Sequence, residues 1–269
     1  MAGFASAGPA DLTLEFQEDE EAQADPLRRF FPSKFRLASR EEGLVLEGIN
    51  GRKRRLGRVF PGCGRAEMGL PSLGRPWRIE EEREAVREGV QAFLRACLQC
   101  RLLEEGGTLL HAAGITHAGR GYAFVGHTRA GKTTLARKFP ARDVVGDDLV
   151  AVRGTGGAPQ LFGTPWPGRE GGAVSYGGVS LVAIFNLNPG QPPGLCPLPA
   201  AEGVAELVSN APRLGHAGEE SRLLAVFSSL AAAVPIYRMS LDPGDDVTPL
   251  LRRFFREEGG DGGGDREGI

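Results

Sequence analysis

The sequence of 269 residues lacks the features that mark membrane, secreted and nucleic-acid-binding proteins. It has no apolar run near the roughly 20 residues needed to cross a bilayer, so no membrane partner is expected. The N-terminal segment has neither a basic start nor a sustained apolar stretch, so no secretory signal is expected. The formal net charge is only -2, and no overall field favours nucleic acid as a partner.

Cysteine is also scarce. Of four cysteines, only Cys97 and Cys100 have a spacing that suggests a metal or redox site. No further ligands in a similar spacing follow, and both residues fall on the apolar side of a helix expected over residues 79–104. Core packing is therefore favoured over metal or redox use, and a reducing, cytoplasmic location is expected.

Four parts can be distinguished along the chain. Residues 1–28 form an acidic segment, partly disordered, and residues 257–269 form a glycine-rich acidic tail that is expected to be disordered. Residues 29–105 are expected to form a small α+β lobe, and residues 106–256 a larger α/β domain.

The small lobe is predicted to contain short strands and one long helix. Alternating segments at FRLAS, GLVLEGI and RLGRVF predict strands, LTLEF is a possible earlier one, and Asn50–Gly51 is typical of a hairpin turn. The basic run GRKRRLGR lies on this hairpin. A solvated edge strand protected by charge is favoured over a nucleic-acid patch.

From Thr108 onward the pattern is that of an α/β domain. Two apolar segments in TLLHAAGITHAGRGYAFVGH, joined by the turn-rich HAGRG, predict an antiparallel hairpin. GKTTLARKF predicts a helix and DVVGDDLVAVR a strand, whereas GTGGAPQLFGTPWPGREGG is typical of a loop. Further strands are expected in VSLVAIFNL and VPIYRMSL, and further helices in PLPAAEGVAELVSNA, EESRLLAVFSSLAAA and VTPLLRRFFREE.

Between the hairpin and the first helix of this domain lies a phosphate-binding pattern. GHTRAGKT fits G-x-x-x-x-G-K-S/T at every fixed position, with a strand before it and a helix after it. The glycines allow main-chain amides to converge on phosphate oxygens, the lysine supplies a cation and the threonine hydroxyl a ligand for Mg²⁺. The expected nucleotide-binding residues are Gly126, His127, Thr128, Arg129, Ala130, Gly131, Lys132, Thr133 and Thr134. His127 and Arg129 occupy free positions of the pattern. For both, the interpretation as exposed, variable residues is favoured over a role above the phosphates.

Two adjacent acids, Asp147 and Asp148, follow the loop and its helix. One acid on a neighbouring strand can hold Mg²⁺, and a second can accept a proton from an acceptor hydroxyl. This combination of metal ligand and base indicates a phosphoryl transferase. The alternative interpretation is a turn with two solvated carboxylates.

Three motifs together, LLHAAGI, GYAFVGHTRAGKTTLA and VVGDDLVAV, resemble the HPr kinase/phosphorylase-like family. The nucleotide fold of that family is similar to phosphoenolpyruvate carboxykinase. Later segments such as GTPWPG and VPIYRMSLDPGDDVTPLL look like shorter HPr-kinase-related proteins, so the resemblance spans about residues 106–256. It implies an α/β fold with a mixed-sheet P-loop kinase core, preceded here by the smaller α+β lobe.

The resemblance also implies roles for individual residues. His111 matches the strand histidine that contacts the acidic pair, Asp148 the catalytic base, and Asp147 the partner acid near the metal, with the order of the two acids open. Together with Lys132 these are the expected catalytic residues, and Thr133 and Asp147 are the expected metal ligands.

The family's long glycine-arginine signature is not found downstream, so the acceptor need not be HPr itself. PGREGG is a candidate remnant, in which Arg169 is either an acceptor-side residue or a solvated loop arginine.

The resulting hypothesis is an ATP-dependent, Mg²⁺-assisted kinase that phosphorylates a hydroxyl, with serine of a peptide or small protein as the expected acceptor. A small-molecule hydroxyl kinase and a nucleotide-gated binding protein without transfer are the alternatives. A DNA-dependent ATPase would require a salt-sensitive DNA affinity. Kinases of this kind often assemble, so a homo-oligomer is an open possibility.

Overall fold

A computed structural model describes residues 13–18, 35–40, 43–48, 55–60, 65–70, 80–154, 157–166, 177–214, 218–241, 246 and 248–259. The chain forms two compact units. One contains Glu105–Pro212 and the described chain from Leu223 onward, and the other contains the described residues up to Glu104 together with Arg213–Arg222. The association of Arg213–Arg222 with the N-terminal unit was not expected from the sequence.

The N-terminal unit has a five-stranded sheet in the order β1-β5-β4-β3-β2. Its elements are β1 (Thr13–Glu18), β2 (Phe35–Arg40), β3 (Gly43–Gly48), β4 (Arg55–Phe60), β5 (Arg65–Leu70) and helix α2 (Glu80–Glu104). β1 and β5 are parallel, and the remaining pairs are antiparallel. The expected strands are confirmed, β5 was not predicted, and Asn50–Gly51 lies outside the described residues. β4 lies between β3 and β5, so the edge-strand interpretation of the basic run is wrong for Arg55–Phe60.

Helix α2 was correctly predicted, and so was the packing of its two cysteines. Phe93, Ala96, Cys97 and Cys100 recur at helical spacing and are all buried. Burial raises the pKa of the Cys97 thiol and raises that of Cys100 to about 12. Both thiols therefore remain protonated and behave as small apolar groups.

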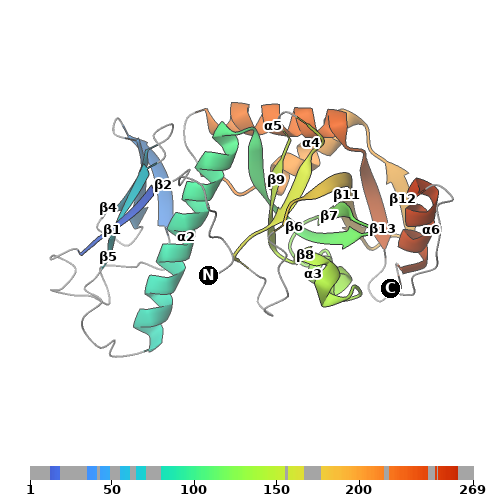
Figure 1. The fold of residues 1–269 in the computed structure, drawn as a ribbon, viewed down its shortest axis with the longest axis horizontal. Coiled ribbons are helices and arrows are strands. Elements are labelled where there is room, and N and C mark those ends of the chain that lie inside the picture. The colour runs from blue at the N-terminus through green and yellow to red at the C-terminus, as the bar shows by residue number, and fades with distance from the viewer. Residues whose placement is uncertain are drawn as a thin grey trace. The chain divides into compact units, whose positions relative to one another are not determined.

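The second unit is built on an eight-stranded mixed sheet flanked by helices (Figure 1). Its elements are β6 (Gly107–His117), β7 (Arg120–Val125), α3 (Lys132–Ala136), β8 (Val144–Gly146), β9 (Leu149–Arg153), β10 (Gln160–Gly163), β11 (Val179–Pro189), β12 (Gly194–Pro197), α4 (Ala200–Ser209), α5 (Glu219–Ala233), β13 (Ile236–Leu241) and α6 (Thr248–Gly259). The first residues of α5 belong to the other unit. No helix in the described part of the chain is both long and apolar enough to span a bilayer.

The strand order is β10-β9-β6-β7-β11-β13-β12, and β8 also pairs with β6. β7 is antiparallel to β6 but parallel to β11, and β11 is parallel to β13. Because β10 pairs with both β9 and β11, five of the strands close into a ring. The α/β class with a mixed sheet is thus confirmed.

Several local predictions need correction. The segment DVVGDDLVAVR forms two strands, β8 and β9, rather than one, and both pair with β6. β10 lies in a segment expected to be a loop, and β12 was not predicted. Helix α3 has only five residues, because Pro140 follows closely and cannot donate the next helical hydrogen bond.

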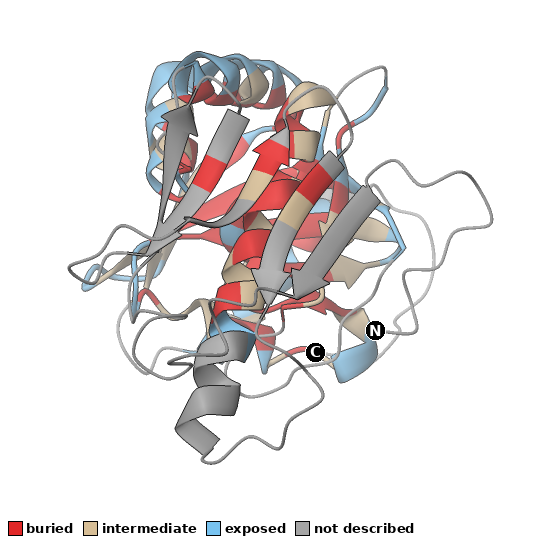
Figure 2. Ribbon diagram, turned by 90° about the vertical axis from the view of Figure 1, so that its left-hand side faces the viewer, coloured by how far each residue is buried: buried red, intermediate tan, exposed pale blue. Residues whose placement is uncertain are grey.

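The core of this unit lies against the central strands. Residues on one face of the sheet, including Tyr122 and Phe185, pack with α3 and with Phe254 and Phe255 of α6. Helices α4 and α5 cover the other face (Figure 1), where Gly203 of α4 lies against the side chain of Ile236. Figure 2 shows buried residues concentrated on the strands and exposed residues on the outer side of the helices.

Candidate functional site

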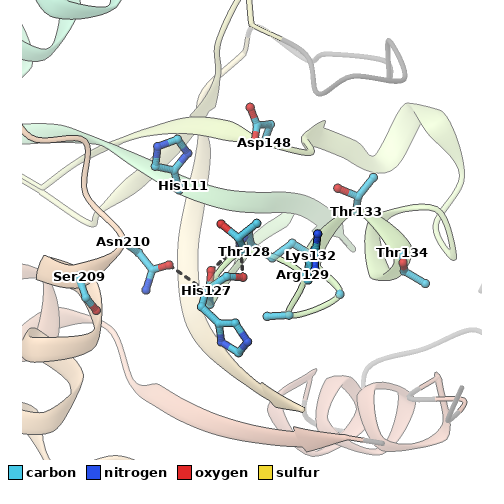
Figure 3. Close-up of a pocket in the computed structure, with 13 residues that line it drawn as sticks. His111, His127, Thr128, Arg129, Lys132, Thr133, Thr134, Asp148, Ser209 and Asn210 are labelled. Atoms are coloured by element: carbon cyan, nitrogen blue, oxygen red, sulfur yellow. Dashed lines mark hydrogen bonds between the residues drawn. The ribbon is translucent and has the colours of Figure 1, made fainter. Parts of the chain in front are cut away.

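A cavity of about 770 Å³ opens where β7 ends and the loop to α3 begins (Figure 3). It lies entirely within the second unit. The residues that line it are His111, Gly126, His127, Thr128, Arg129, Ala130, Gly131, Lys132, Thr133, Thr134, Asp148, Ser209 and Asn210.

The loop between β7 and α3 needs its two fixed glycines. Gly126 has a φ of 150°, and a Cβ added there would lie 3.0 Å from the Ala130 Cβ and 3.1 Å from the Leu187 carbonyl oxygen. Gly131 caps α3 with a φ of 99°, in a region that side chains disfavour. The loop therefore follows a tight path past β11, and its main-chain amides lie at the cavity.

Lys132 folds back over this loop. Its ammonium donates hydrogen bonds to the carbonyl oxygen of Gly126 and, at 3.1 Å, to that of His127. Burial lowers the pKa of the Lys132 ammonium from its ordinary value, and the charge of Asp148 partly opposes this shift. The cation is thus tied to the loop carbonyls and lies within reach of the charge of Asp148.

His111 and Asp148 come to the cavity from neighbouring strands. The break between β8 and β9 falls at Asp147 and Asp148, and the backbone amide of Ala112 donates to the Asp148 carbonyl oxygen at 3.2 Å. This hydrogen bond brings Asp148 beside His111, which is exposed although its neighbours on β6 are buried. The segment is therefore fixed to the same strand that presents the histidine.

The two adjacent acids have different environments. Both lie in the bend between β8 and β9 rather than in a strand. Asp148 lines the cavity, whereas Asp147 is only 7% exposed and is not among the lining residues. The structure therefore brings one carboxylate of the expected pair to the loop.

Sequence reasoning missed Asn210, which joins three parts of the site. Its side-chain oxygen accepts a hydrogen bond from the Gly126 amide at 3.1 Å, and its side-chain nitrogen donates to the Glu206 carbonyl at 2.9 Å. Its own carbonyl accepts from the His111 amide at 2.9 Å. Ser209 lines the cavity beside it. No local pattern marks these residues, because they lie at the end of α4, far along the chain from the loop.

Most of the expected site residues share this one cavity. Residues 126–134, His111 and Asp148 all line it, Asp147 does not, and Arg169 lies outside the described residues. In the described ranges, no three His, Cys, Asp or Glu side chains gather as a metal cluster. The cavity wall carries the cations Lys132 and Arg129 against the single carboxylate of Asp148, a balance that favours an anionic ligand.

Comparison with known proteins adds no assignment. No protein-family model matches the chain, and no curated protein matches it. What the fold and site define is a mixed-sheet α/β protein with a glycine-flanked, cationic loop at a cavity. Any assignment of function therefore depends on the chemistry of that cavity.

Proposed function

We propose that this protein is an ATP-dependent P-loop kinase of the HPr-kinase type, which transfers the γ-phosphoryl group to a hydroxyl. A serine of a peptide or small protein is the expected acceptor. The observation that carries the proposal is that the G-x-x-x-x-G-K-S/T loop, a strand histidine and a carboxylate line one cavity.

The cavity suits a nucleotide triphosphate in shape and charge. Its volume of about 770 Å³ lies within the range of roughly 300–1,000 Å³ that is usual for ligand pockets. A Cβ at Gly126 would strike Ala130 and the Leu187 carbonyl, so glycine allows the tight path on which the loop amides would approach phosphate oxygens. Lys132 supplies the positive charge that such loops place against the terminal phosphates.

The same wall offers an oxygen ligand for Mg²⁺. The hydroxyl of Thr133 lines the cavity, and oxygen ligands are the ones Mg²⁺ prefers. Bound there, Mg²⁺ would neutralise charge on the phosphates. Asp147 as a metal ligand remains a prediction, since its side chain is buried beside the cavity.

We assign the role of base to Asp148, whose carboxylate lines the cavity. The acceptor hydroxyl would give its proton to the Asp148 carboxylate while its oxygen bonds to the γ-phosphorus, and the bond to the leaving ADP oxygen breaks. His111, presented by the neighbouring strand, would orient that carboxylate. Lys132 and the loop amides would hold the phosphates in line throughout.

A transfer assay with variants tests the proposal. The wild type, supplied with ATP and Mg²⁺, should phosphorylate a hydroxyl in a panel of peptides and small hydroxy compounds, as detected by mass spectrometry. Asp148→Asn should keep ATP affinity within about threefold and lower transfer by about 100-fold or more. Full transfer by Asp148→Asn would show that the base assignment is wrong.

The same assay separates the alternatives. Product formed only on small hydroxy compounds would indicate a small-molecule kinase. Stabilisation by ATP without product on any acceptor would indicate a nucleotide-gated binding protein, and absence of ATP binding would contradict the whole proposal.

A further inference from the structure

Arg129 adopts a backbone conformation that suits glycine. Its φ is 71°, and the only other described non-glycine residue with a positive φ is Ala118, in the tight turn between β6 and β7. A Cβ makes this left-handed region costly for an arginine. The loop thus needs a positive φ at position 129 as well as at Gly126 and Gly131, and it carries a long cationic side chain there in place of glycine.

The guanidinium of Arg129 is also uncommitted within the described structure. Its side chain is exposed and lines the cavity, yet it makes no hydrogen bond or ion pair with any residue that the structure describes. Several other arginines of this unit are paired: Arg153, for example, lies 3.1 Å from Glu105 and Arg238 lies 3.1 Å from Glu202. A strained backbone thus presents an unpaired planar cation at the rim of the loop.

We propose that Arg129 binds the terminal phosphate of the nucleotide and makes the site selective for triphosphates over diphosphates. This inference rests on the proposed function, because it assumes that the loop holds nucleotide phosphates. Lys132 is a compact charge tied to the carbonyls of Gly126 and His127, at the inner part of the loop. Arg129 is on its exposed rim, and its longer fork can donate two parallel hydrogen bonds to the oxygens of the outermost phosphate.

The test compares binding of ATP, ADP and inorganic tripolyphosphate by calorimetry in the presence of Mg²⁺. Arg129→Gly should lower the affinity for ATP and for tripolyphosphate about tenfold or more, as expected for loss of a charge-assisted contact. It should lower the affinity for ADP by less than about threefold. Arg129→Lys should retain part of the selectivity. Arg142→Ala, which removes an exposed arginine outside the cavity, should leave all three affinities unchanged.

A stability measurement separates the effect of losing the cation from the effect of relieving the backbone strain at residue 129. Arg129→Gly and Arg129→Ala lack the same cation, so they should lose the same selectivity. Because glycine has no Cβ, Arg129→Gly should melt at a higher temperature than Arg129→Ala and no lower than the wild type.

The outcomes are distinct. If Arg129→Gly lowers the affinities for ATP and ADP equally, or changes neither, Arg129 does not bind the terminal phosphate, although the proposed nucleotide site is not contradicted. If the wild type binds neither nucleotide nor tripolyphosphate, the proposed function fails, and this inference with it. No phosphoryl transfer is needed for either result.

Discussion

The two ends of the β6–β7 hairpin differ in composition and in surroundings. At the turn, His117 stacks on Phe255 with ring centroids 4.5 Å apart, and Tyr122 lies 4.6 Å from the same ring. At the open end, β7 runs into the glycine loop and β6 presents the exposed His111. One strand pair thus has an aromatic, packed end and a polar, open end.

This difference indicates how the unit can tolerate a strained, cationic loop. From that end, rings of β7, β11 and α6 continue as a cluster along the same face of the sheet; Phe254, for example, meets Phe185, which pairs with Phe124, edge-on at 5.1 Å. Burial of such rings contributes most of the stability at a site of this kind. The cavity residues contribute little to packing, so their side chains are available for binding. Substitutions at the two ends should therefore separate function from stability.

The largest effect is expected at the open end. Lys132→Ala removes the cation from the cavity wall and should lower ATP affinity by at least about 100-fold and abolish turnover. Its melting temperature should stay within about 2 °C of the wild type, because no packed apolar group is lost. Lys138→Ala is the control, since this lysine lies in the same segment and pairs with Asp246 outside the cavity. An equal loss of ATP affinity in both variants would instead indicate a general effect of removing a positive charge.

The next largest effect is expected in the aromatic cluster around Phe254. Phe254 is 6% exposed and contacts rings from three other elements. Phe254→Ala should lower the free energy of unfolding by about 3–5 kcal/mol in urea titrations, while ATP affinity of the folded protein stays unchanged. Arg253→Ala, on the exposed side of the same helix, should change stability little. A large loss of ATP affinity in Phe254→Ala would show that the aromatic cluster and the cavity are coupled.

Prediction from sequence succeeded where the pattern is local. The loop is a contiguous motif, and the hairpin before it alternates clearly, so both were found, as were the long helices with regular apolar spacing. The short strands β10 and β12 escaped because glycine and proline around them hide their alternation. The β8–β9 break escaped because it depends on the register with β6, which shifts at Gly114.

The site could be predicted only in part for the same reason. Asp148 could be paired with the loop from a family resemblance, but which of the two adjacent acids lines the cavity depends on the bend between β8 and β9. Asn210 reaches Gly126 across 84 residues of sequence, and no local rule anticipates such a contact.

Asn210 gives a prediction of intermediate size, since it joins the loop to α4. Asn210→Ala leaves the buried amide of Gly126 without its acceptor, which should cost about 1–2 kcal/mol of stability and reduce ATP affinity severalfold. Both effects should appear together, unlike at Lys132 or Phe254. Ser209→Ala, which loses an exposed hydrogen bond to the same Glu206 carbonyl, should leave stability nearly unchanged. If Asn210→Ala has no effect on affinity, the loop does not need this support.

The smallest effect is the pH dependence of the packed end. Burial against α6 lowers the pKa of His117 from its ordinary value, and the charge of Asp143 partly opposes this. The folded state therefore favours the neutral ring, so its contribution to stability is present above the unfolded pKa of about 6.5 and is lost as pH falls below it. Unfolding titrations between pH 5 and 8 should show this slope in the wild type and not in His117→Phe, whose ring can stack on Phe255 without titrating. An identical slope in both would assign the pH dependence to other groups, and the effect should be modest because His117 is only partly buried.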